Sequence, residues 1–173
     1  VGGLVPVEAA FSLKTLVGGR GGEVECRTDG AALPAGNRSG YVGTARIEEI
    51  DSARHITLIG SDPGTEAPVL GARIRKAWLK GAEITHLGQP AELTFGAEKL
   101  GAHPQALARL VEEAKPQEDA LVIVGQGALQ GDNGAAIHGQ AMQLAEAQGA
   151  GLLILHTLRD LSGQPWRPRR APR

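Results

Sequence analysis

Four largely apolar segments recur along the chain, and segments with helical periodicity separate them. They read HITLIG at 55–60, AEITHLG at 82–88, ALVIVG at 120–125 and GLLILHT at 151–157. Strands that are apolar throughout are typical of parallel sheets whose two faces are both covered. Their alternation with helices indicates βαβ crossovers. We therefore predict an α/β fold: a layered parallel sheet with flanking helices.

The intervening segments predict helices with one apolar face each. A helix over about 64–80 aligns Ala67, Leu70, Ile74 and Trp78, and two more cover 103–116 and 134–149. Before the first strand, a helix over 6–19 ends at Gly18-Gly19. Thr44 is placed to cap a helix that buries Ile47 and Ile50. A short strand is expected within 23–27, and residues 93–102 remain unassigned.

Composition excludes several function classes. The 173 residues carry 18 Lys and Arg against 19 Asp and Glu, so no net positive charge favours nucleic acid. No apolar run reaches the roughly 18–20 residues that cross a bilayer, so we expect no membrane insertion. Cys26 is the only cysteine. It can form no internal disulfide and no four-thiolate cluster, which is consistent with a reduced, intracellular setting.

The junction at Gly60, Ser61 and Asp62 is the first candidate for ligand chemistry. A helix that begins directly after a strand can bind a phosphate at its N-terminus. Here Asp62 or Thr65 is the expected N-cap, and Asp62 and Glu66 bring negative charge to that point. Pro63 and Pro68 remove backbone donors near it. The residues favour a helix capped by its own side chains over a phosphate site.

The second candidate lies at Gly125 and Gly127, after the strand at 120–125. A dinucleotide fingerprint requires G-x-G-x-x-G, but the third glycine here is Gly131, one position late. The fingerprint also needs a carboxylate about 20 residues further on, and 148–156 contains none. A turn with positive φ accounts for these glycines equally well.

Other candidates are weaker. Residues 33–43, LPAGNRSGYVG, form either a surface loop or a contact loop through Asn37, Arg38, Ser39 and Tyr41. His86 and His156 lie near strand ends, where α/β proteins bind ligands, although each also suits a structural role. No histidine pair has metal-ligand spacing, and no set of nucleophile, base and orienting group is apparent. We predict no catalytic residue and no metal ligand. Arg73, Arg75, Lys76 and Lys80 predict a solvated or partner-facing surface.

The sequence resembles a known family over residues 5–157. The run from Cys26 to Gly88, above all LPAGNRSGYVG and EAPVLGARIRKAW, is similar to the C-terminal part of the large iron–sulfur subunit of NADH:quinone oxidoreductase, respiratory complex I. ALVIVGQGAL and GLLILHT resemble the same region further on. The resemblance implies a fold like that of molybdopterin oxidoreductases such as formate dehydrogenase. It also implies one such domain fragment at 1–157.

In those oxidoreductases a G-S-N-P element contacts the guanine dinucleotide cofactor. Gly60, Ser61 and Asp62 match it, with Asp62 in place of Asn. The resemblance implies a domain without a redox centre, whose vestigial cofactor positions are Gly60, Ser61, Asp62, Gly125 and Gly127. The 4Fe-4S and 2Fe-2S clusters would belong to an N-terminal part that is absent here. The alternative is a fragment that still binds molybdopterin guanine dinucleotide.

The resemblance also implies partners and a location. The partners would be other peripheral-arm subunits of an electron-transferring complex that reduces quinone, at the cytoplasmic face of the bacterial inner membrane. Because the chain begins with Val1, we expect it to be part of a longer protein. Self-association is expected if the fragment leaves apolar surface uncovered. The Arg- and Pro-rich tail at 158–173 is expected to be disordered or to be a basic arm.

Overall fold

The computed structural model describes residues 6–24, 39–89 and 91–155. The chain divides into two compact units, residues 31–155 and residues 1–30 with 156–173. In the latter, helix α1 (Val7–Gly18) follows Pro6 and ends before Gly19, as predicted, and none of its residues is buried. Cys26, His156, most of the strand expected at 23–27 and the tail lie outside the described residues.

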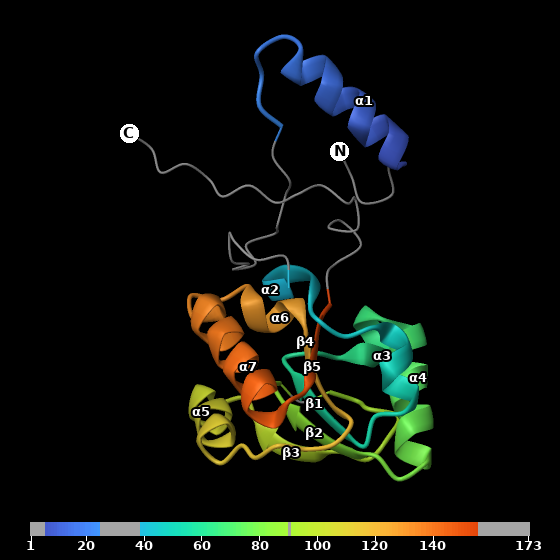
Figure 1. The fold of residues 1–173 in the computed structure, drawn as a ribbon, viewed down its shortest axis with the longest axis vertical. Helices are drawn as coiled ribbons and strands as arrows, with labels where there is room; N and C mark the ends of the chain where they lie inside the picture. The colour runs from blue at the N-terminus through green and yellow to red at the C-terminus, as the bar shows by residue number, and fades with distance from the viewer. Residues whose placement is uncertain (1–5, 25–38, 90, 156–173) are drawn as a thin grey trace. The chain divides into compact units, whose positions relative to one another are not determined.

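Residues 31–155 contain a five-stranded parallel sheet in the order β3-β2-β1-β4-β5 (Figure 1). The strands are β1 (His55–Ile59), β2 (Glu83–Leu87), β3 (Glu98–Gly101), β4 (Ala120–Val124) and β5 (Gly151–Ile154). The four predicted strands are present, and the predicted α/β class is confirmed. Strand β3 lies in the segment that the pattern left unassigned.

Helices cover both faces of the sheet. Helices α5 (Pro104–Glu112) and α7 (Gly134–Gln148) lie on one face, and α4 (Pro68–Leu79) lies on the other (Figure 1). Successive residues of β4 face opposite cores: Val122 packs with Leu107 and Leu144, whereas Ile123 packs with Leu70. Every residue of β4 is buried, as expected for a central strand. The short helices α2 (Ser39–Val42) and α6 (Gln126–Leu129) also belong to this unit.

The helix predicted over 64–80 is interrupted. It forms α3 (Pro63–Glu66) and α4, with Ala67 between them at φ −149°. Pro68 causes the break, because proline disfavours helical backbone in the residue before it. Leu70 and Ile74 are buried as predicted, but Trp78 is 37% exposed.

The helix predicted from Thr44 is also wrong in start and type. A 3-10 helix, η1 (Ile47–Asp51), begins after Arg46 and buries Ile50, whereas Ile47 is 50% exposed. Thr44 pairs with the sheet edge instead: its N–H donates to the Leu152 carbonyl at 2.8 Å, and its Oγ1 accepts from the Leu152 N–H at 3.0 Å. These bonds satisfy edge groups of β5.

No described helix is long and apolar enough to span a membrane.

Candidate functional site

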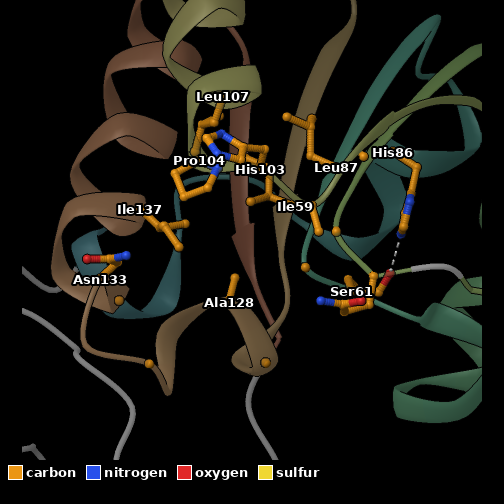
Figure 2. A pocket seen from close by; sticks show the side chains of 18 of the residues that line it. Ile59, Ser61, His86, Leu87, His103, Pro104, Leu107, Ala128, Asn133 and Ile137 are labelled. Carbon is orange, nitrogen blue, oxygen red and sulfur yellow. Dashed lines mark hydrogen bonds between the residues drawn. The ribbon is translucent and has the colours of Figure 1, made fainter.

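A cavity of about 470 Å³ opens at the carboxyl ends of β1 and β2 (Figure 2). Its walls come from the turn after β1, the end of β2, and the first turns of α5 and α7, with α6 below. Apolar side chains form much of the lining: Ile59, Leu87, Pro104, Leu107, Ala128 and Ile137. In open α/β sheets this edge is where ligands bind.

The turn after β1 is closed by its own side chains. Gly60 adopts φ +55°, and its N–H donates to the Leu87 carbonyl at 2.6 Å. Asp62 is the N-cap of α3: one carboxylate oxygen accepts from the Gly64 N–H at 3.1 Å, and the other accepts from the Thr65 hydroxyl at 2.9 Å. A carboxylate therefore occupies the position at which this helix start would receive an anion.

Glu66 adds a second carboxylate to the same wall. Its Oε2 accepts a hydrogen bond from the buried Ser61 hydroxyl at 3.1 Å. Partial burial raises the pKa of the Glu66 carboxyl and the charge of Asp62 raises it further, while hydrogen bonds from the Asp62 backbone and from Ser61 oppose that rise. The net direction is upward.

His86 supports this turn from β2. It is only 2% exposed, and its Nε2 lies 3.2 Å from the Ser61 carbonyl oxygen. Because a carbonyl only accepts, Nε2 is assigned as the donor of this bond. Ser61 is thus bonded to α3 through its hydroxyl. Its carbonyl bonds to His86 of β2 (Figure 2). The structure gives His86 this positioning role at the cavity wall.

The two predicted candidate sites, residues 60–62 and Gly125 with Gly127, lie side by side. Gly60, Ser61, Asp62 and Gly127 line the cavity, and Gly125 lies directly behind them. A Cβ on Gly125 would lie 2.4 Å from the Gly60 carbonyl oxygen, so this glycine is needed for close packing of two strand ends. Gly125 has φ −83°, so the positive-φ explanation is wrong for it.

Other predicted contact residues lie elsewhere. Arg73 pairs with Asp51 on the far face, and Lys80 donates to the Asp51 carbonyl at 2.9 Å. Ser39 and Tyr41 belong to α2, while Asn37 and Arg38 lie outside the described residues. His138 had no predicted role. It is buried in α7, and its Nε2 bonds to the Gly40 carbonyl. A lone histidine inside a predicted helix gave no signal of that contact.

The lining does not fit a phosphate-bearing dinucleotide. Among the described residues that line the cavity there is no Lys or Arg, whereas Asp62, Glu66 and Asp132 are all present. A pyrophosphate placed here would meet these carboxylates, and the described lining holds no Lys or Arg to offset the repulsion. In the described part of the chain, no three His, Cys, Asp or Glu side chains are grouped so as to hold a metal ion.

Comparisons with known proteins agree on a family. The 78 kDa subunit of mitochondrial NADH-ubiquinone oxidoreductase from Candida albicans is 34% identical over 146 residues, which cover 79% of this chain and 20% of the relative. The Neurospora crassa 78 kDa subunit is 35% identical over 141 residues, or 73% and 18% of the two chains. The mitochondrial NADH dehydrogenase [ubiquinone] iron-sulfur protein 1 of Solanum tuberosum is 30% identical over 145 residues, or 79% and 20%.

The chain thus spans about a fifth of the length of these relatives. The resemblance to the large iron–sulfur subunit of complex I is confirmed. A family model for the molybdopterin oxidoreductases matches residues 1–159, nearly the whole chain. The chain therefore belongs to the molybdopterin oxidoreductase family.

Proposed function

We propose that the chain is a structural domain of the large iron–sulfur subunit of NADH:quinone oxidoreductase and holds no redox centre of its own. The observation that supports the proposal is the cavity after β1, where Asp62 and Glu66 are part of a described lining that contains no Lys or Arg. The similarity to the 78 kDa subunit and to iron-sulfur protein 1 of the relatives supports this parent complex.

The parent enzyme would pass electrons from NADH to quinone through iron–sulfur clusters held outside this segment. The domain would lie in the peripheral arm, at the cytoplasmic face of the inner membrane if the source is bacterial. Its contribution would be packing surface for neighbouring subunits. We propose residues 1–157 as this domain and treat 158–173 as a separate tail.

The outer face of α4 is the surface we propose for a neighbouring subunit. Val69 is 76% exposed and Leu79 is 67% exposed, and Arg75 and Lys76 are exposed between them. Apolar side chains beside exposed cations suit a partner with an acidic rim and an apolar centre. The opposite side of α4 holds the helix to the sheet through Leu70 and Ile74.

The test is co-purification from native membranes. When the protein that contains this chain is purified by an affinity tag, NADH-oxidising activity and iron should co-purify with it. The isolated 173-residue chain should contain neither iron nor molybdenum. Lys76→Glu should reduce the recovered activity, and Lys115→Glu, an exposed charge change beyond α5, should not. Stoichiometric metal on the isolated chain, or a tagged protein free of NADH-oxidising activity, would contradict the proposal.

The alternative is a fragment that still binds a guanine dinucleotide through residues 60–62 and 125–127. It is supported by the family match and by the position of the cavity at the carboxyl edge of the sheet. Calorimetry with GDP separates the two. The structural-domain proposal expects no binding at millimolar nucleotide, whereas saturable binding that Gly127→Val removes would favour the alternative.

A further inference from the structure

The cavity after β1 has the size and lining of a small-molecule site. At about 470 Å³ it lies within the range of roughly 300–1,000 Å³ that is common for such sites. Figure 2 shows Leu107 and Ile137 on one side and Ile59 and Leu87 on the other, with Ala128 below. Opposed apolar walls of this kind suit a flat, apolar ring.

The acidic side chains of the described lining outnumber its basic ones, which are His86 and His103. Asp62, Glu66 and Asp132 line the cavity, and the described lining contains no Lys or Arg. Asp62 and Glu66 already accept hydrogen bonds from the protein, but an ionised carboxylate has about four lone-pair sites and accepts more than one donor. A ligand that presents N–H donors or a positive charge toward this wall would be stabilised, and an anion would be repelled.

We propose that the cavity binds small aromatic molecules that carry a cationic or uncharged hydrogen-bond donor, and that it discriminates against anions of the same shape. The ring lies between the apolar walls, and the donor points toward Glu66. This selectivity is the opposite of the one that a phosphate-bearing cofactor requires. The proposal concerns the isolated chain and does not depend on assembly into an electron-transfer complex.

Three probes that share one ring and differ in charge test it: benzamidine as the cation, benzyl alcohol as the neutral form and benzoate as the anion. Each is titrated into the isotope-labelled 173-residue chain, and amide chemical shifts are followed by NMR. Benzamidine should bind about tenfold more tightly than benzoate, because the two probes differ by two units of charge beside partly screened carboxylates. The shifted amides should include those of Gly127 and Gly131, which line the cavity.

Two variants with matched controls locate the effect. Ile137→Trp should fill the cavity and remove binding of all three probes, while Met142→Trp, a partly exposed position on the same helix, should leave binding unchanged. Glu66→Gln should weaken benzamidine several-fold without affecting benzyl alcohol. Glu112→Gln, an exposed acid at the end of α5, should change neither.

The outcomes that overturn the proposal are specific. They are equal or tighter binding of benzoate, shifts confined to amides away from the cavity, and no response to any probe at millimolar concentration. If Ile137→Trp fails to fold, the wild-type shifts and the Glu66→Gln comparison decide the question. Loss of co-purification with the complex, by contrast, would contradict the proposed function and leave this inference intact.

Discussion

The backbone of Gly125 packs against the carbonyl oxygen of Gly60, at the point where β4 and β1 both end. A Cβ atom on Gly125 would lie 2.4 Å from that oxygen and 2.7 Å from the Ser61 Cα. Both neighbours are backbone atoms of the turn that directly follows β1, and in a densely packed interior neither can move aside at low energy. The contact places the two predicted candidate sites, residues 60–62 and Gly125 with Gly127, at one structural junction.

Gly125→Ala is expected to lower the free energy of unfolding by about 1–3 kcal/mol, as overpacking of a dense core typically does. Gly127→Ala is the matched control, because its Cβ would lie 3.4 Å from the same oxygen. As an alanine inside a short helix it should be neutral or stabilise the fold by up to about 1 kcal/mol. Urea unfolding measures both. Equal effects would show that the close approach is not what requires Gly125.

Asp62→Ala should remove the N-cap of α3 and lower the free energy of unfolding by about 0.5–2 kcal/mol. The change leaves the Gly64 N–H and the Thr65 hydroxyl without their acceptor. Asp62→Asn should lose much less, because asparagine caps helices about as well as aspartate. Thermal unfolding of the two variants tests the difference. An Asn variant as unstable as the Ala variant would mean that charge, not capping, is the stabilising element.

The titration of Glu66 should appear in the pH dependence of stability. Its pKa is raised in the folded chain above the ordinary value of 4.5. The folded state therefore holds this proton more tightly, so the stabilisation is complete below pH 4.5 and is lost as pH rises through the folded pKa. Glu66→Gln does not titrate at this position. As pH rises through the folded pKa of Glu66, the wild type should therefore lose unfolding free energy relative to Glu66→Gln. The effect is small because the side chain is partly exposed.

The pKa of Glu66 can be measured directly by following its carboxyl carbon chemical shift by NMR as a function of pH. Asp62→Asn should lower the Glu66 pKa, since the neighbouring charge is one of the causes of the rise. A Glu66 pKa at or below its ordinary value in the wild type would show that burial and the charge of Asp62 do not raise it.

The pattern of apolar strands was sufficient to predict most of the sheet, because β1, β2, β4 and β5 carry their signal locally. Strand β3 was not predictable, since Glu98 and Lys99 are exposed at an edge and the pairing shifts register at His86 and Leu87. The break at Ala67 was readable in principle from Pro68, but the apolar spacing of Leu70 and Ile74 masked it.

For the site, the sequence indicated the strand ends and the capping of α3 by Asp62. It could not indicate the cavity, because the walls at Leu107 and Ile137 come from α5 and α7, far along the chain. It also gave no sign that Ser61 bonds to His86, since that contact depends on how β1 and β2 are aligned.

The contact between His138 and Gly40 joins segments that are 98 residues apart in the chain. His138 is buried in α7, and its Nε2–H donates to the Gly40 carbonyl of α2. His138→Leu places an apolar side chain at this position and leaves the Gly40 carbonyl without its donor. The unfolding free energy should fall by about 1–3 kcal/mol. His138→Gln, which retains a donor, should recover part of the loss. Hydrogen exchange should speed up at residues 40–43 in the Leu variant but not at β4, because the bond secures α2 and not the sheet. Unchanged exchange at 40–43 would mean that other contacts hold α2 in place.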